Sequence, residues 1–201
     1  MIAVIDYGMG NLRSVTNALE KLGADVVVTR DKKVIKASRA IILPGVGAFG
    51  KCIENLKNLE LLGFIKGEIE EGKQYLGICL GMQVLFESSE EAPGIAGMAV
   101  LKGTAPRFTG TIKIPHMGWN SIKIEKETEI LKGIENNEYF YFVHSYYCLP
   151  EDKGIVATTT PYGGEFVSSV QKDNIFACQF HPEKSQKEGL KLLQNFINLA
   201  S

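Results

Sequence analysis

The sequence predicts an α/β fold: a single three-layer domain whose central sheet is mostly parallel. In the first half of the chain, short apolar segments alternate with amphipathic segments of helical periodicity, the pattern of parallel strands joined by crossover helices. In the second half, short segments rich in β-branched and aromatic residues lie between turn residues, which predicts some antiparallel strands. A length of 201 residues suits one such domain.

Four short apolar segments predict the parallel strands. They are expected at residues 2–6, 26–29, 40–43 and 74–78. A first helix is expected after Asn11, which can cap a helix N-terminus, and should end at Gly23. A second helical stretch extends from the glycine-rich segment 44–50 to about residue 72, and a third helix covers 80–87. Because sites in such sheets form beyond the carboxyl ends of strands, segment 44–50 and Cys79 are well placed for chemistry.

The second half, from about residue 97, predicts strands followed by one helix. The strands are expected at residues 122–125, 139–143, 155–160, 166–171 and 175–180. Leu190, Leu193, Phe196 and Ile197 share one face of an amphipathic pattern over 185–199, which predicts a closing helix. No internal repeat or linker interrupts the sequence, so one continuous domain is the simplest interpretation.

The charge balance argues against partners that need a strong field. Lys+Arg number 22 and Asp+Glu 23, a formal net charge of −1, so neither nucleic acid nor an anionic membrane is expected as a partner. No apolar run reaches the roughly 18 residues of a membrane span, and the N-terminal residues lack the pattern of a secretion signal. The four cysteines are widely spaced and lack zinc-ligand spacing, so we expect reduced thiols, no metal and a cytoplasmic protein.

Cys79 lies in a segment that a structural cysteine does not require. Residues 77–81 read Gly-Ile-Cys-Leu-Gly, a cysteine version of the G-x-S-x-G nucleophile elbow. The glycines let a strand turn sharply into a helix, so that the side chain is held exposed on a strained backbone. The helix N-terminus favours thiolate, and the N–H of Leu80 can bind an oxyanion. The motif also arises by chance, and a buried structural cysteine is the alternative.

A second motif offers an acid/base pair. Residues 179–183 read Gln-Phe-His-Pro-Glu at the end of the last expected strand. Proline keeps the preceding residue extended, and residues two apart in an extended chain face the same side, so His181 and Glu183 are predicted to lie together. A carboxylate beside an imidazole fixes its tautomer and stabilises its cation. Alone, the pair also fits a surface contact; beside Cys79 it predicts a Cys-His-Glu triad.

The glycine-rich segment 44–50 admits two uses. Its sequence, Pro-Gly-Val-Gly-Ala-Phe-Gly, matches G-x-G-x-x-G after a strand, the pattern of a dinucleotide site. It follows the third expected strand rather than the first, however, and no ribose-binding acid closes a compact βαβ unit. A backbone strip that lines the cysteine pocket and supplies a second oxyanion N–H explains the segment better.

Five motifs together resemble those of the class I (triad) glutamine amidotransferases over the whole length of the chain. They are PGVGAFG at 44–50, GICLGMQVLFE at 77–87, PHMGWN at 115–120, YFVHSY at 141–146 and QFHPEKS at 179–185. The resemblance implies a flavodoxin-like fold, one amidotransferase domain over residues 1–201, and no metal or organic cofactor. The implied substrate is glutamine, which is hydrolysed to glutamate and ammonia.

The resemblance also implies the roles of the triad. Cys79 attacks the side-chain amide of glutamine. His181 accepts the thiol proton and later protonates the leaving ammonia, while Glu183 orients His181. Water then hydrolyses the thioester to glutamate.

Further positions are implied to bind the oxyanion and the substrate. The N–H of Leu80 and an amide of the 44–47 strip, that of Val46 or Gly45, form the oxyanion hole. The positions implied to hold glutamine are Gly47, Gln83, Glu91, Ser145 and Tyr146. Without the resemblance, Glu91 would be interpreted as a solvated charge in an acidic run.

A second chain is implied as the consumer of the ammonia. Within the family, the motifs are most similar to members of histidine biosynthesis that form a heterodimer with a (β/α)₈-barrel cyclase subunit. The cyclase uses ammonia and the ribotide PRFAR to make imidazole glycerol phosphate and AICAR. The residues expected near the interface are His116, Met117, Trp119 and Asn120. An exposed Trp119 suits an interface anchor, and the alternative is that it fills the core.

Three other functions compete with this interpretation. A paralogous amidotransferase could feed ammonia to an enzyme that amidates a surface sugar. A non-catalytic binding module would have a degenerate triad, whereas Cys79, His181 and Glu183 are all present. A cysteine peptidase would use a similar dyad, but no extended substrate groove can be recognised in the sequence.

Overall fold

An eight-stranded sheet, in the order β2-β1-β3-β4-β13-β12-β11-β8, forms the centre of the protein. The structure is a computed structural model and describes residues 1–200. Neighbouring strands are parallel from β2 to β13, and antiparallel from β13 to β8. The expected fold class, a mostly parallel sheet with antiparallel strands from the second half of the chain, is confirmed.

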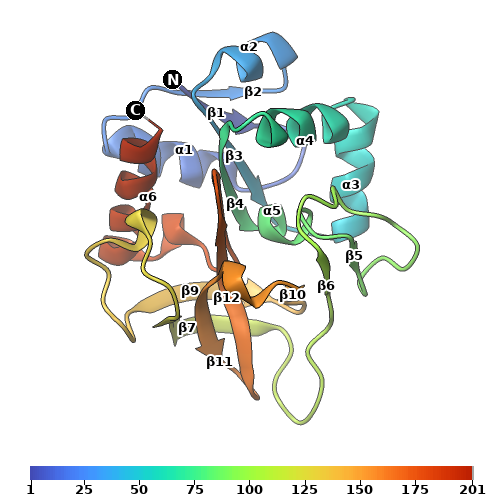
Figure 1. Cartoon of the computed structure of the whole chain (residues 1–201), viewed down its shortest axis with the longest axis vertical. Coiled ribbons are helices and arrows are strands. Elements are labelled where there is room, and N and C mark those ends of the chain that lie inside the picture. The colour runs from blue at the N-terminus through green and yellow to red at the C-terminus, as the bar shows by residue number, and fades with distance from the viewer. Residues whose placement is uncertain (201) are drawn as a thin grey trace.

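The strands of the main sheet are β1 (Ile2–Ile5), β2 (Val26–Thr29), β3 (Ala40–Gly45), β4 (Gln74–Cys79), β8 (Lys123–Ile124), β11 (Val156–Pro161), β12 (Glu165–Lys172) and β13 (Ile175–Cys178). The chain also forms a three-stranded sheet of β5 (Ser88–Ser89), β6 (Gly103–Ala105) and β10 (Leu149–Pro150), and a two-stranded ribbon of β7 (His116–Ser121) and β9 (Tyr139–His144). The small sheets lie beyond one end of the parallel strands (Figure 1).

Helices cover both faces of the sheet (Figure 1). They are α1 (Leu12–Lys21), α2 (Lys32–Ala37), α3 (Phe49–Asn58), α4 (Leu62–Glu70), α5 (Leu80–Gln83) and α6 (Gln186–Leu199), with short 3₁₀ turns η1 (Glu129–Leu131), η2 (Lys153–Ile155) and η3 (Pro182–Lys184). Alternate residues of β1 separate two cores: Ala3 and Ile5 pack with α2, α3 and α4, whereas Ile2 and Val4 pack with α1 and α6. This is the period of two that a sheet buried on both faces requires.

The helix expected over residues 80–87 is wrong in length, because α5 ends at Gln83. The carbonyl oxygens of Val84, Leu85 and Phe86 accept hydrogen bonds from the N–H groups of Met98, Val100 and Ala99, respectively. Those carbonyls therefore bind a distant segment rather than continuing the helix.

Two other differences concern elements that the sequence patterns did not separate. The long helical stretch up to residue 72 is two helices, α3 and α4. Helix α2, which begins at an Asp31 cap, and strand β7, which contains the PHMGWN motif, were not expected as regular elements. The cap of α1 is as expected: Asn11 accepts a hydrogen bond from the N–H of Ser14.

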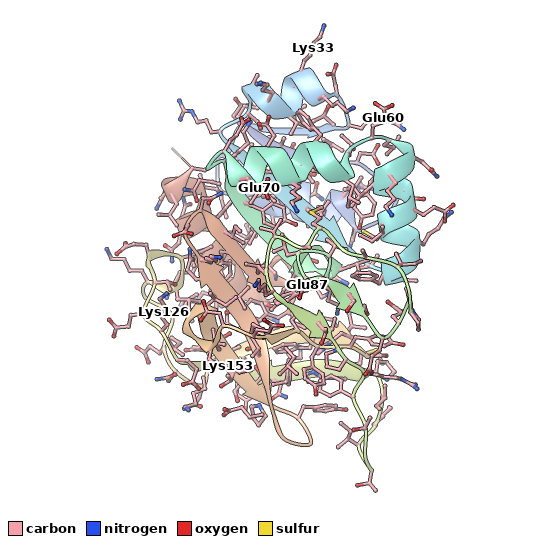
Figure 2. The ribbon with its side chains drawn as sticks, turned by 45° about the vertical axis from the view of Figure 1, so that its right-hand side comes forward. Lys33, Glu60, Glu70, Glu87, Lys126 and Lys153 are labelled. Carbon is pink, nitrogen blue, oxygen red and sulfur yellow. The ribbon has the colours of Figure 1, made fainter. Side chains whose placement is uncertain are left out.

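Charged side chains of both signs lie over many elements. Figure 2 labels Lys33 on α2, Glu70 on α4, Glu87 after α5, and Lys126 and Lys153 around the second half of the chain. No helix within residues 1–200 is long and apolar enough to cross a membrane.

The turn after β4 packs closely against β3 at positions where glycine has no side chain. A Cβ added at Gly81 would overlap the carbonyl oxygen of Leu43, and one added at Gly77 would lie 2.5 Å from the carbonyl oxygen of Gly81. A Cβ at Gly45 would lie 2.6 Å from the Cβ of Leu80. The glycines of the motif are therefore needed for close approach, since real side chains do not fit there.

Two histidines are buried under the β7–β9 ribbon. His116 is 3% exposed and His144 is 6% exposed, and they are paired directly across the ribbon. The ring of His116 stacks on Phe142 and on Tyr162. Burial lowers the pKa of His116 to about 4 and that of His144 to about 3.

Gly81→Ala should strongly destabilise the protein. The added methyl group would force the turn away from Leu43, and overpacking of this kind costs about 1–3 kcal/mol, or more where the backbone must move. Urea unfolding measures the change. Gly67→Ala in α4 is the control, because a Cβ there meets no atom of residues 1–200 within 4 Å apart from its chain neighbours and the backbone of its own helix; it should be neutral or stabilising by up to about 1 kcal/mol. Equal stability of Gly81→Ala and wild type would contradict this account of the turn.

Acidification from pH 6.5 to pH 4 should destabilise the fold through His116 and His144. Their pKa values are lowered on folding, so the unfolded chain binds protons in this range while the folded histidines stay neutral. Each histidine contributes up to about 1.4 kcal/mol per pH unit, present above pH 6.5 and lost as the pH falls. The free energy of unfolding, measured by urea titration at several pH values, should fall less steeply in His116→Gln/His144→Gln. An unchanged slope would contradict the assignment.

Candidate functional site

The turn after β4 holds Cys79 in a strained conformation beside two neighbouring strands. Cys79 has a φ of +54°, in the left-handed region that residues other than glycine rarely adopt. It lies beside Gly45 of β3, while the preceding Ile78 pairs with Cys178 of β13. The expected strained backbone is therefore present. The expected exposure is wrong: Cys79 is only 7% exposed, because strands and loops surround the turn.

His181 and Glu183 are in contact, as expected. His181 Nδ1 lies 2.9 Å from Glu183 Oε1, and the two side chains are 2% and 1% exposed. The geometry differs from the extended chain that the sequence predicted, because Glu183 belongs to the 3₁₀ turn η3. His181 has an extended backbone, but Pro182 and Glu183 do not. The 3₁₀ turn, rather than the alternation of side chains along a strand, therefore brings the carboxylate to the imidazole.

Backbone hydrogen bonds hold His181 in place. Its N–H donates to the carbonyl oxygen of Tyr141 in β9 over 2.9 Å. The hydroxyl of Ser185 donates to the His181 carbonyl oxygen over 2.7 Å and accepts from the Tyr141 N–H over 3.0 Å. His181 is therefore held at its backbone N–H and carbonyl groups, and its imidazole is held at Nδ1.

The electrostatic surroundings of His181 favour its cation. Burial by itself lowers the pKa of His181, but the Coulombic interactions with Cys79 and Glu183 and the hydrogen bond to Glu183 outweigh burial and raise it to about 10. Nε2 is buried and forms no hydrogen bond to residues 1–200, and Nδ1 is occupied by Glu183. Nε2 is thus the ring atom left to exchange a proton with a nucleophile and a leaving group.

A pocket of about 250 Å³ opens at Cys79. Its lining comprises Val46, Gly47, Cys79, Leu80, Gln83, Glu91, Pro115, Val143, His144, Ser145 and Tyr146. Every position implied to hold glutamine is in this set, together with Val46 and Leu80 of the expected oxyanion hole. A larger hollow of about 850 Å³ between residues 124 and 136 contains none of the expected site residues, so the smaller pocket is the candidate site.

The glycine-rich strip lies along one side of the pocket. Gly45 is the last residue of β3, and beyond it Val46 is 37% exposed and Gly47 has a φ of +108°. The carbonyl oxygen of Pro44 accepts a hydrogen bond from the buried Tyr7 hydroxyl over 2.9 Å, which anchors the start of the strip. The amides of residues 45–47 therefore leave a fixed strand end and run beside the turn that carries Cys79.

Glu91 and Gln83 enter the pocket from different elements. Glu91 Oε2 accepts a hydrogen bond from the N–H of Phe49 over 2.8 Å, at the start of α3, so it is not simply a solvated charge. Gln83 is 4% exposed, and its Nε2 donates to the carbonyl oxygen of Tyr146 over 3.1 Å. A carboxylate and an amide at the pocket wall suit an amino acid that carries an ammonium group and a side-chain amide.

Gln179 is the site residue that sequence reasoning missed. It is fully buried, and its Nε2 lies 3.4 Å from Cys79 Sγ. The residue belongs to the Gln-Phe-His-Pro-Glu motif, but the sequence assigns it no role, because the contact of its amide with the sulfur depends on the register of β13 on β4. His144, Val143 and Pro115 were also not expected in the pocket lining.

The residues expected at a partner interface have different environments. Met117 and Trp119 are 58% and 47% exposed, so the alternative that Trp119 fills the core is wrong. Asn120 is half-buried. The side chain of His116 is buried, and it therefore cannot itself touch a partner on the face that Met117 and Trp119 present.

No group of His, Cys, Asp or Glu side chains within residues 1–200 is arranged to hold a metal ion. All four cysteines are free and buried. Burial raises the pKa of Cys52 to about 12 and raises the pKa values of Cys148 and Cys178 well above their ordinary range. These three thiols are therefore poor nucleophiles.

Two relatives that are about half identical to the chain carry the same name. The chain is 54% identical over 194 residues to the "Imidazole glycerol phosphate synthase subunit HisH" of Aquifex aeolicus, covering 96% of this chain and 94% of the relative. It is 51% identical over 199 residues to the protein of the same name from Methanocaldococcus jannaschii, covering 99% and 100%.

Solved structures with lower identity share the fold. A glutamine amidotransferase crystal structure has a TM-score of 0.78 and 20% identity, covering 100% of this chain and 99% of that one. A chain of PurLQS from Thermotoga maritima has a TM-score of 0.76 and 23% identity, covering 100% and 98%. The family model described as "Glutamine amidotransferase class-I" matches residues 3–199. The chain therefore belongs to the class I glutamine amidotransferase family.

Proposed function

We propose that this chain is the glutaminase subunit of an imidazole glycerol phosphate synthase, and that residues 1–201 form its single amidotransferase domain. The observation that carries the proposal is the pocket in which Cys79, which interacts with His181 of the His181–Glu183 pair, meets Gln83 and Glu91. The names of relatives about half identical over nearly the whole chain support this destination for the ammonia over surface-sugar amidation. Its free thiols suit the reducing cytoplasm, where we place it.

The reaction begins with proton transfer from Cys79 to His181. The raised pKa of His181 favours an imidazolium beside the thiolate, and Glu183 stabilises that cation through Nδ1. The thiolate attacks the side-chain carbonyl carbon of glutamine, and the carbonyl oxygen becomes an oxyanion. The N–H of Leu80 and an amide of the strip, that of Val46 or Gly45, donate to this oxygen.

Collapse of the tetrahedral intermediate releases ammonia. The C–N bond breaks as His181 returns its proton to the leaving nitrogen, and a thioester to Cys79 remains. His181, now neutral, takes a proton from water, which attacks the thioester. The second intermediate expels the thiolate, releases glutamate and restores the starting ion pair.

The substrate is held by groups on both sides of the sulfur. Glu91 binds the α-ammonium group through its carboxylate, and Gln83 presents an amide. Gly47, Ser145 and Tyr146 offer backbone and hydroxyl groups to the rest of the ligand. The hydrogen bond that the Phe49 N–H donates to Glu91 Oε2 keeps the carboxylate oriented before glutamine binds.

Ammonia passes to a (β/α)₈-barrel cyclase subunit, with which the chain forms a heterodimer. The proposed docking surface is the outer face of the β7–β9 ribbon, where Met117, Trp119 and Tyr139 are about half exposed or more. Aromatic residues and methionine are enriched at the centres of interfaces. Trp119 contacts Tyr141 edge-to-face, at 6.1 Å between ring centroids, so its ring is already oriented.

Cys79→Ala should separate ammonia production from ammonia use. In the reconstituted complex with the cyclase, glutamine-dependent synthesis of imidazole glycerol phosphate should disappear, because no other pocket group forms a thioester. Synthesis from an added ammonium salt at high pH should persist, since that chemistry belongs to the other subunit. Cys148→Ala, also buried but outside the pocket lining, is the matched control and should retain both activities. Glutamine-dependent synthesis by Cys79→Ala would refute the nucleophile.

Trp119→Ala should weaken assembly without unfolding the chain. Loss of an aromatic anchor typically costs about 2 kcal/mol or more of binding, or roughly thirtyfold in the dissociation constant of the cyclase complex. Titration calorimetry measures the affinity, and urea unfolding should change little because the side chain is 47% exposed. Val28→Ala removes a similarly exposed apolar side chain from β2, an edge strand of the main sheet outside the β7–β9 ribbon, and should bind normally. Equal affinities of the two variants would place the interface elsewhere.

A further inference from the structure

A continuous series of hydrogen bonds begins at the sulfur of Cys79. Gln179 Nε2 lies 3.4 Å from Cys79 Sγ, and Gln179 Oε1 lies 3.0 Å from Gln83 Nε2. Gln83 Nε2 also lies 3.1 Å from the carbonyl oxygen of Tyr146. Gln83 and Gln179 are almost fully buried, so the orientation of each amide is decided by these partners rather than by water.

The same Tyr146 carbonyl continues the series through the two buried histidines. It lies 2.7 Å from His144 Nδ1. His144 Nε2 lies 2.9 Å from His116 Nδ1, and His116 Nε2 lies 3.2 Å from Asn120 Nδ2. Gln179, Gln83, Tyr146 and His144 thus connect Cys79 to His116 and Asn120 of strand β7, which carries Trp119 on its other face.

The Asn120 end assigns a direction to the hydrogen bonds. Asn120 Nδ2 donates to the carbonyl oxygen of Pro161 over 2.8 Å, and Asn120 Oδ1 accepts from the Ser121 N–H over 2.9 Å. These two contacts fix the amide orientation independently of the histidines. The second N–H of Asn120 therefore donates to His116 Nε2, so the proton of a neutral His116 is on Nδ1 and donates to His144 Nε2.

The Tyr146 end assigns the same direction. A carbonyl oxygen only accepts, so His144 must carry its proton on Nδ1, and its Nε2 must accept from His116. The two ends agree on one arrangement, in which both histidines are neutral Nδ1–H tautomers. The lowered pKa values of His116 and His144 are consistent with neutral rings.

The contact with the Tyr146 carbonyl oxygen also determines the amide orientations of Gln83 and Gln179. Because the Tyr146 oxygen accepts, the nearby Gln83 atom is the donating nitrogen, and its second N–H donates to Gln179 Oε1. Gln179 therefore has its NH₂ group facing Cys79. A flipped Gln179 would place two donors against each other at Gln83 and an oxygen against the sulfur.

We propose that Gln179 is a further catalytic residue of the glutaminase, whose side-chain N–H donates to the Cys79 thiolate, and that Gln83, Tyr146, His144, His116 and Asn120 position it. The inference deepens the proposed function and rests on Cys79 being its nucleophile. A donor stabilises a thiolate more than a thiol because the acceptor is charged. Gln179 thus supplies a hydrogen bond to the sulfur in addition to the charge of His181.

Gln179→Met tests the hydrogen bond directly, since methionine is of similar length and lacks the donor. The rate of alkylation of Cys79 by iodoacetamide, measured against pH on the full chain, reports its thiolate. Loss of a hydrogen bond to a charged group should move the midpoint up by about one to two pH units, a tenfold to hundredfold change in the equilibrium. Gln171→Met is the matched control on β12, where Gln171 Nε2 donates to the Asp173 carbonyl oxygen, and should leave the midpoint unchanged. Cys79→Ser identifies the labelled site.

A measurement on the unsubstituted chain covers the case in which Gln179→Met fails to fold. The side-chain amide signal of Gln179, assigned through bonds in the nitrogen NMR spectrum, should shift as Cys79 titrates. The same signal should stay constant over that pH range in Cys79→Ala. A Gln179 signal that ignores the titration, or equal alkylation midpoints for Gln179→Met and wild type, would overturn the proposal.

The histidine tautomers test the positioning part separately. The chain has three histidines, so ¹⁵N imidazole signals can be assigned with single variants. At pH 7, His116 and His144 should both be neutral with the proton on Nδ1. Asn120→Asp replaces the donor by an acceptor and should move the His116 proton to Nε2 or produce an imidazolium. Nε2–H tautomers in the wild-type chain would overturn the assigned direction.

These outcomes are separable from the proposed function. Alkylation and NMR involve neither glutamine nor a partner, so a chain without glutaminase activity would still report the hydrogen bonds. Conversely, an active glutaminase with an unchanged alkylation midpoint in Gln179→Met would retain the proposed function and refute the role of Gln179.

Discussion

The close contact between the turn after β4 and the backbone of β3 is the constraint on which the site depends. Cys79 holds a φ of +54° in a turn where Gly77 and Gly81 allow backbone to pack against backbone, with Gly81 directly against the Leu43 carbonyl. Strain of this kind costs about 1–3 kcal/mol and persists where the surrounding structure enforces it. Moving the turn outward would separate the sulfur from His181, from Gln179 and from the strip at 45–47 together.

The parallel sheet explains why those groups converge. β3, β4 and β13 are neighbours and run in the same direction, so the segments that follow them emerge at one edge. The first carries the amide strip, the second carries Cys79, and the third continues into Gln179, His181 and η3. Because β3 and β13 are the two neighbours of β4, the amide strip and the segment with Gln179 and His181 flank the turn that carries the sulfur.

Sequence reasoning succeeded where the signal is local. The strands of the parallel sheet follow from short apolar runs, and the turn at Cys79 follows from two glycines at fixed offsets. It failed where contacts with residues distant in sequence determine the local structure. Helix α5 ends at Gln83 because the carbonyl oxygens of residues 84–86 accept hydrogen bonds from residues 98–100. Gln179 was missed for the same reason, since its role depends on β13 pairing with β4. The His181–Glu183 contact was predicted correctly from a wrong geometry.

The β7–β9 ribbon shows how one short motif serves two sides of the molecule. Along β7, His116, Gly118 and Asn120 alternate with the exposed Met117 and Trp119, as the period of a strand requires. The outward residues form the apolar face that we assign to the cyclase. The inward histidine and asparagine belong to the hydrogen-bonded series that ends at the sulfur. Because both sets share one backbone, the register of β7 on β9 determines at once where a partner can dock and how the Tyr146 carbonyl is held.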